Sequence, residues 1–131
     1  MKRQIKFRGK RVNGGEWVES MSISFGTIKR KCNNMFFEVT PNKWIGVVPE
    51  TVGQFTGITL NNKEVYEHDL INCFGVLCEV VYNEGIAAFV LLELHSNTRG
   101  VRPIGEMFDL FNCEVIGNIH DNSELKVLVS R

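Results

Sequence analysis

One short stretch concentrates the side chains that acid–base or metal chemistry uses: Glu64-Val65-Tyr66-Glu67-His68-Asp69. Paired carboxylates can hold Mg²⁺ or act as general acid and base. Glu67 and Asp69 are two residues apart, so in an extended strand they share one face while His68 points to the other. A solvated acidic turn is the commoner use of such a stretch, and Asp69 can instead accept backbone N–H groups. A metal-dependent enzyme built on Glu64, Glu67 and Asp69 is therefore our third and weakest hypothesis, and we expect no catalytic residue.

The four cysteines, Cys32, Cys73, Cys78 and Cys113, do not have the spacing of a zinc site. The closest pair, Cys73 and Cys78, lies in what reads as two strand pieces around a glycine, and the three histidines are scattered singly. We expect all four thiols to be reduced and to pack as small hydrophobic side chains, with no metal and no cofactor.

Charge is balanced overall but uneven along the chain. Residues 1–44 carry ten Lys and Arg and three Glu, a net charge of +7. Residues 45–131 carry five Lys and Arg and twelve Asp and Glu, a net charge of −7. This asymmetry indicates either contact with an anionic partner such as nucleic acid, or association between unlike ends, or neutralisation within one molecule. The candidate nucleic-acid contacts are Lys6, Arg8, Lys10, Arg11, Lys29, Arg30 and Lys31.

Aromatic residues lie among these cations, as in proteins that stack and neutralise single-stranded nucleic acid. Phe7 and Trp17 are the two concerned. Strand alternation places Phe7 opposite Lys6 and Arg8, so packing into a core is the simpler explanation for Phe7.

The elements that must position these residues are mostly strands, because the hydrophobic pattern has a period of two. A first hairpin is predicted from 4–8 and 17–25, with Trp17, Glu19, Met21, Ile23 and Phe25 on one face. Further strands are predicted at 25–28, 35–39, 44–48, 70–74, 76–82, 86–94 and 114–119. Residues 49–57 are expected to be irregular or to form a single helical turn that begins at Pro49. Loops are expected at 83–85 and 103–105. Residues 122–128 begin with a residue that can cap a helix, but their β-branched residues weaken the prediction of a helix there.

Many short strands joined by Gly and Asn turns predict an all-β sandwich or small barrel. The three successive strands within 69–94 resemble the meander of an SH3-like barrel. We expect one domain, 1–131, with a basic N-terminal β region (1–48) and an acidic SH3-like β region (49–131). The longest apolar run, Ile86–Leu92, is too short to span a bilayer, so we expect a cytoplasmic protein without a membrane partner.

Three blocks of sequence resemble the YopX-like family of small phage and prophage proteins. They are Ile5–Lys10 with Gly15–Val18, Val48–Gly57 with Asn62–Ile71, and Glu114–Leu125. Two positions depart from the family pattern: His68 stands where glycine is usual, and His120 where tyrosine is usual. The resemblance implies an all-β fold with an SH3-like part, a phage or prophage origin and a largely uncharacterised function, and it assigns no site residue.

The leading hypothesis is a non-enzymatic accessory protein of phage or prophage origin. It would act in the cytoplasm of the bacterial host by binding other macromolecules, as a homo-oligomer with Trp17 or Trp44 as an apolar anchor. The sequence does not identify a host or phage protein as partner. The second hypothesis is a nucleic-acid-binding module that uses the basic N-terminal region.

Overall fold

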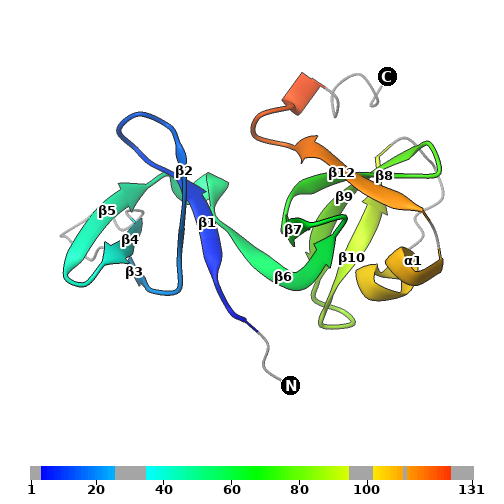
Figure 1. The fold of residues 1–131 in the computed structure, drawn as a ribbon, viewed down its shortest axis with the longest axis horizontal. Helices are drawn as coiled ribbons and strands as arrows, with labels where there is room; N and C mark the ends of the chain where they lie inside the picture. Colours follow the sequence, from blue (N-terminus) through cyan, green and yellow to red (C-terminus); the bar gives the residue numbers. More distant parts are fainter. Residues whose placement is uncertain (1–3, 26–34, 95–101, 111, 125–131) are drawn as a thin grey trace. The chain divides into compact units, whose positions relative to one another are not determined.

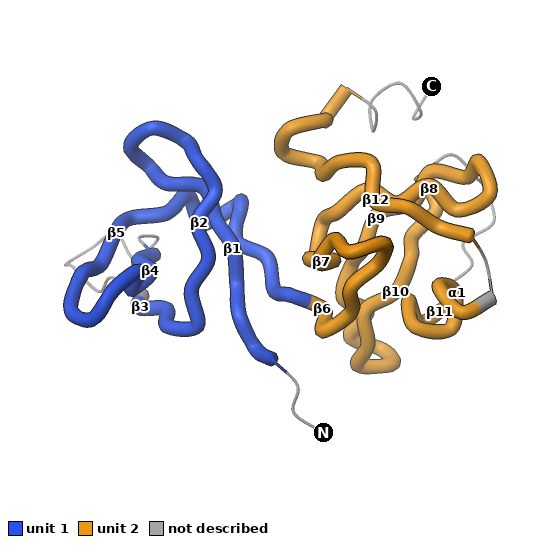
Figure 2. The backbone as a smooth tube through the Cα atoms, in the orientation of Figure 1, with its two compact units in different colours: residues 1–55 blue, residues 56–131 orange. Residues whose placement is uncertain are grey.

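The computed structural model describes residues 4–25, 35–94, 102–110 and 112–124, which fall into two compact units, 1–55 and 56–131 (Figures 1 and 2). Nearly all the regular structure consists of curled antiparallel strands, so the all-β prediction is confirmed. The SH3-like detail and the single domain stay predictions. Of the helical residues that are described, none belongs to a helix with the length and apolar character needed to cross a bilayer.

Unit 1 consists of two small groups of strands. Its elements are β1 (Phe7–Lys10), β2 (Trp17–Ser20), β3 (Ile23–Phe25), β4 (Met35–Thr40), β5 (Lys43–Val47), a 3₁₀ turn (Pro49–Thr51) and the start of β6 (Gly53–Leu60). β1 pairs with β2 and with the start of β6, and β4 pairs with β3 and β5.

Close packing around Gly9 forms the centre of unit 1. Phe37 and Val47 are fully buried. A Cβ atom at Gly9 would lie 3.1 Å from a Val52 methyl group and 3.4 Å from the Phe37 ring, so this position has no room for a side chain without displacement of its neighbours.

The predicted strand 17–25 is wrong at its middle, where the chain breaks between β2 and β3. Ser20 is buried, and its hydroxyl lies 2.7 Å from the Glu38 carbonyl oxygen and accepts the Ser22 N–H at 2.9 Å. Because this serine interrupts the alternation, Met21 is exposed rather than part of an apolar face.

The region after β5 confirms one expectation and corrects another. Pro49 does open a single helical turn, but Gly53–Gly57 is part of the eight-residue strand β6 rather than irregular chain. Gly53 and Phe55 alternate as buried residues along β6, and pairing with β1 outweighs the low strand preference of glycine. Residues 26–28, predicted to extend a strand, lie outside the described residues.

Unit 2 has a five-stranded antiparallel sheet in the order β11-β10-β9-β8-β12, with β7 beside the rest of β6. Its elements are β7 (Lys63–Tyr66), β8 (Asp69–Cys73), β9 (Val76–Asn83), β10 (Ala88–Glu93), β11 (Arg102–Pro103), α1 (Ile104–Leu110) and β12 (Cys113–Asn118). The three successive strands and the final strand predicted from the sequence are confirmed. β10 begins two residues later than expected, after a four-residue turn that ends at Ala87 with φ 53°.

The loop predicted at 103–105 is wrong, because Ile104 begins helix α1. Ile104 is buried in the unit 2 core, and Met107 and Phe108 pack against the same cluster, which is the spacing of one helical face. Pro103 and Gly105 are typical of loops, but the packing of Ile104, Met107 and Phe108 against the core stabilises a helix here. Residues 125–128 of the predicted C-terminal helical opening lie outside the described residues.

Candidate functional site

A row of three cations lies on one face of β1 and the residue before it. Alternation along the strand places Lys6, Arg8 and Lys10 on the face opposite the buried Gly9, and the sequence predicted this shared face for Lys6 and Arg8. We call these three residues the cationic stripe. Cross-strand pairing sets Trp17 opposite Lys10.

The indole of Trp17 lies under two of these cations. The Arg8 guanidinium carbon is 4.6 Å from the centroid of the Trp17 ring, and the Lys10 ammonium is 5.3 Å from it. Both distances are in the range of a cation–π interaction. Arg8 and Lys10 therefore already engage the aromatic face that a stacked base would need.

Two of the predicted nucleic-acid contacts have carboxylate partners. Lys6 Nζ lies 3.4 Å from Glu19 Oε1, and Arg11 Nη1 lies 3.4 Å from Glu16 Oε2. The structure thus brings Lys6, Arg8 and Lys10 together, but it also supplies acidic groups that reduce their net charge. Lys29, Arg30 and Lys31 lie outside the described residues.

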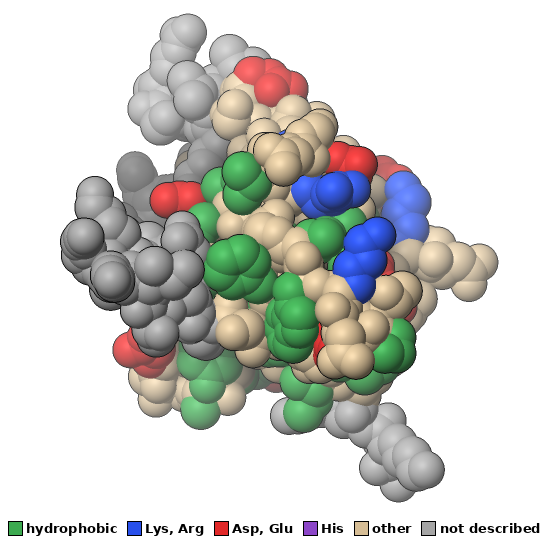
Figure 3. Space-filling model, turned by 90° about the vertical axis from the view of Figure 1, so that its left-hand side faces the viewer, with side chains coloured by type: hydrophobic (Ala, Val, Ile, Leu, Met, Phe, Trp, Pro, Cys, Tyr) green, Lys and Arg blue, Asp and Glu red, His purple; other side chains and the backbone are tan. Residues whose placement is uncertain are grey.

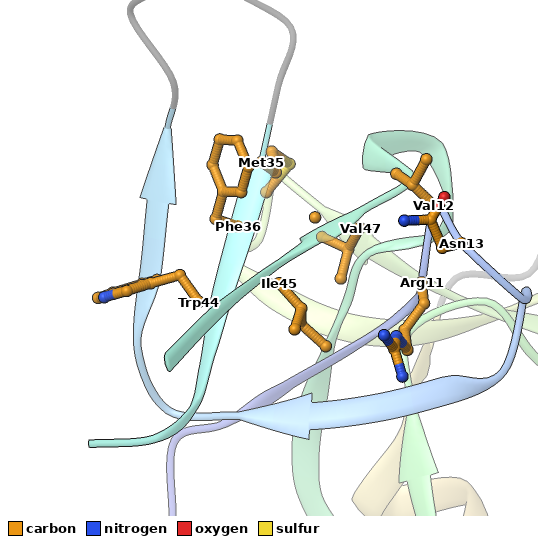
Figure 4. A pocket seen from close by; sticks show the side chains of 9 residues that line it. Arg11, Val12, Asn13, Met35, Phe36, Trp44, Ile45 and Val47 are labelled. Carbon is orange, nitrogen blue, oxygen red and sulfur yellow. The ribbon is translucent and has the colours of Figure 1, made fainter. Parts of the chain in front are cut away.

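The apolar groove is the second surface feature of unit 1, a hollow of about 480 Å³ beside β5. The apolar side chains of Val12, Phe36, Trp44 and Ile45 line it, together with the polar side chains of Arg11 and Asn13 (Figure 4). Trp44 is 44% exposed and Val12 61% exposed. Figure 3 shows hydrophobic side chains gathered on the face of the molecule that the β3–β5 sheet presents.

The first half of β5 is an open sheet edge next to this groove. β4 pairs with one side of β5, and on the other side the described residues contribute the Arg11–Val47 bridge and the Val12 N–H, which donates to the Gly46 carbonyl at 3.0 Å. Both contacts lie at the C-terminal end of β5. An open edge and exposed apolar side chains are together the usual features of a protein-binding surface.

The acidic stretch in unit 2 does not form the predicted strand face. β7 ends at Tyr66 and β8 begins at Asp69, so Glu67 and His68 form the turn between them, with His68 at φ 76°. Asp69 is buried and its carboxylate accepts the Tyr66 N–H at 2.8 Å, which confirms the alternative role expected for it.

Glu64 also contacts Tyr66, whose hydroxyl donates to the Glu64 carboxylate at 3.3 Å. Across the described ranges, no group of three or more His, Cys, Asp or Glu side chains is arranged to hold a metal ion. The three carboxylates of the third hypothesis are therefore not brought together as a ligand set.

Sequence reasoning missed a partly buried cluster around His68. Its Nδ1 lies 2.9 Å from a carboxylate oxygen of Glu79, which is only 3% exposed, and the His120 ring meets the His68 ring edge-on at 5.8 Å. The His68 main chain also donates to the Val80 carbonyl and accepts the Ile119 N–H. Long gaps in the sequence separate these residues, so spacing carries no signal for them. The two histidines that depart from the family pattern are nevertheless neighbours in space.

The predicted burial of the cysteines is confirmed for the three that are described, Cys73, Cys78 and Cys113, which are free thiols in the unit 2 core. Burial raises the pKa of the Cys78 thiol to about 12, with smaller effects from Cys73 and Glu93. Burial also raises the pKa of Cys113 to about 12, and the hydrogen bond that it donates to Cys73 acts in the same direction. Cys32 lies outside the described residues.

These features define the class as a small, almost entirely β protein built from curled antiparallel sheets. A family model described as YopX protein matches residues 6–126, nearly the whole chain, and the chain belongs to the YopX family. No curated protein matches the sequence. The resemblance found in the three sequence blocks is therefore confirmed, while the phage origin stays a prediction.

Proposed function

We propose that the chain is a non-enzymatic accessory protein of phage or prophage origin that binds macromolecules in the bacterial cytoplasm and assembles as a homo-oligomer. Membership of the YopX family is consistent with this class. The opposite net charges of residues 1–44 and 45–131 favour attraction between copies, and the overall charge of zero removes long-range repulsion.

One observation carries the proposal: the apolar groove beside the open edge of β5. Charge complementarity alone seldom holds an interface together, and a buried aromatic anchor commonly supplies most of the affinity. Of the two tryptophans expected to serve as anchor, Trp17 lies under Arg8 and Lys10, whereas Trp44 stands exposed in the groove. Trp44 is therefore the anchor that we propose.

Light scattering after gel filtration of the full chain, at tens of micromolar, tests the proposal. We expect a mass of several chains at low salt. An assembly anchored by Trp44 should persist at ~1 M salt, where the screening length is roughly 3 Å, whereas one held by charge alone should weaken. The mass of one chain under both conditions would overturn the proposal.

A pair of variants locates the anchor. Trp44→Ser should weaken self-association by roughly thirtyfold, the effect of removing one strong interface residue. Tyr82→Ser is the matched control, because Tyr82 is a similarly exposed aromatic residue on β9, at 47% against 44%. Equal weakening by the two substitutions would exclude the groove as the contact surface.

The cationic stripe supports nucleic-acid binding as a second candidate function. Lys6, Arg8 and Lys10 follow one strand face, a geometry that can track a phosphate backbone. It ranks second because Arg8 and Lys10 cover Trp17 and because Glu19 lies beside Lys6.

Salt dependence tests this second function, because each neutralised phosphate adds about 0.7 to 0.9 to the log–log slope of affinity against salt. Oligonucleotide affinity should then be highest at low salt and fall steeply as the salt concentration rises, and reversing the charge of Arg8 and Lys10 together should remove most of the binding. Arg102→Glu is the control, an exposed cation on β11. No binding to single-stranded or duplex oligonucleotides at low salt would eliminate this candidate.

A further inference from the structure

Two thiols of the unit 2 core are placed to react with each other. Cys73 is the last residue of β8 and Cys113 the first of β12, and they are direct partners across this antiparallel pair. Their sulfur atoms are 2.7 Å apart. Direct partners in antiparallel strands have Cα atoms about 4.5 or 5.5 Å apart, within the range of roughly 4.4–6.8 Å that a disulfide spans. The Cα separation of such partners therefore permits a disulfide between them.

Both thiols border surface hollows although they are almost fully buried. Cys73 lines a hollow of about 180 Å³ together with Cys78 and Met107, and Cys113 lines another of about 280 Å³ together with Asn72. Each hollow has room for more than one water-sized molecule, so a small oxidant can come next to either cysteine from solvent.

We propose that Cys73 and Cys113 form a reversible oxidative modification site, at which hydrogen peroxide or a peroxide of similar size converts the two thiols into a cross-strand disulfide. The pair is reduced in an unstressed cytoplasm, in agreement with the sequence expectation, and becomes oxidised when peroxide is present.

Either thiol can attack the peroxide first, because the two are direct partners across the strand pair. In the reaction that starts at Cys73, Cys113 is the resolving thiol.

The reaction balances in two steps. The Cys73 sulfur attacks one peroxide oxygen, the O–O bond breaks, and the products are Cys73 sulfenic acid and one water molecule. The Cys113 sulfur then attacks the sulfenic sulfur, the S–O bond breaks, and the departing hydroxide takes the Cys113 proton to leave as a second water molecule. Two thiols are thereby oxidised by two electrons, and one peroxide is reduced to two water molecules.

The disulfide would be a covalent cross-link within unit 2. It closes a loop that contains β9, β10 and α1, and a cross-link over a loop of this length restricts the unfolded chain strongly. We expect oxidation to raise the melting temperature by roughly 10 °C, an effect that a thiol reductant reverses.

The test treats the folded full chain with hydrogen peroxide, blocks the remaining thiols by alkylation, and maps the cysteines by peptide mass spectrometry. We expect a loss of two hydrogen atoms per chain and a linked peptide that contains Cys73 and Cys113. Cys78→Ser is the matched control, because Cys78 is a buried thiol of the same core and its loss should leave the disulfide intact. Cys113→Ser should instead leave Cys73 as a sulfenic or sulfinic acid.

The mapping on the wild-type chain decides the proposal even if a variant fails to fold. Thiols that all stay unmodified, or a disulfide that links Cys78 or Cys32 in place of this pair, would overturn it. So would Cys73 oxidised beyond sulfenic acid while Cys113 stays a free thiol, because resolution would then be slower than further oxidation.

Discussion

The two compact units differ in where they place polar and apolar side chains. Unit 2 buries Asp69, Glu79 and Asn118, and each has a hydrogen-bond partner: the Tyr66 N–H, the His68 ring and the N–H groups that follow Asn118, respectively. In the described part of unit 1 the buried polar side chain is the uncharged Ser20, the charged side chains of β1 and β2 are partly or fully exposed, and apolar side chains line the groove.

Burial of a polar group costs free energy unless the group is hydrogen-bonded. Two of the buried polar side chains of unit 2 are hydrogen-bonded to backbone N–H groups of turns. Asp69 closes the β7–β8 turn, and Asn118 closes the turn after β12. The contrast teaches that unit 2 uses buried charged side chains to fix its turns, whereas both units leave large apolar side chains exposed on their surfaces.

Thiol reactivity should show the largest effect, because the raised pKa of a buried thiol lowers its thiolate fraction. A rise in the pKa of Cys78 from 9.0 to about 12 lowers its thiolate fraction at pH ~8 by roughly a thousandfold. Iodoacetamide should therefore label Cys78 about a thousand times more slowly in the folded protein than in urea. Labelling at similar rates in both would show that the core is open.

The same pKa shift makes stability depend on pH. The folded-state pKa is the higher one, so above pH 9.0 the unfolded thiol ionises first. The stability associated with this thiol is thus fully present below pH 9.0 and is lost as the pH rises toward about 12. Urea unfolding of wild type and Cys78→Ser across this range would measure the difference, and parallel pH profiles would contradict it.

Core packing in unit 1 should give the next largest effect. Phe37→Ala removes a fully buried ring and should lower the free energy of unfolding by about 3–5 kcal/mol. Phe36, the next residue on β4, lines the groove, and Phe36→Ala should cost less than half as much. Equal losses in urea denaturation would mean that the groove face is as well packed as the interior.

The buried turn of unit 2 should show a smaller effect. Asp69→Ala leaves the Tyr66 N–H without its carboxylate acceptor and should lower the free energy of unfolding by about 2 kcal/mol. Glu84→Ala, in an exposed turn of the same unit, should stay within about 0.5 kcal/mol of wild type. A neutral Asp69→Ala would refute the view that buried polar groups organise unit 2.

The outward charges of unit 1 should contribute least to stability. Arg8→Gln removes a cation from the face of Trp17 and should cost about 0.5–1 kcal/mol, measured by urea unfolding followed by tryptophan fluorescence. Arg102→Gln breaks an exposed ion pair with Glu106 and should cost roughly 0.3 kcal/mol. A loss above about 2 kcal/mol for Arg8 would show that the stripe is structural.

Strand period and turn composition were sufficient to predict the all-β class, most strands of unit 2 and the outward face of β1. These features are local, because alternation over a few residues decides which side chains a strand buries. The same local reasoning failed at Ser20, at Gly53–Gly57 and at Ile104, where contacts distant in sequence outweigh residue preference.

The sequence by itself determined the family, the fold class, the uneven charge and the candidate cations. Only the tertiary structure placed Arg8 over Trp17, His68 beside His120 and Cys73 against Cys113. The pairing of strands selects these neighbours, and the register between β8 and β12 joins residues 40 positions apart. Spacing along one chain carries no information about such a register, because it is set by the burial of whole strand faces rather than by the residues that finally meet.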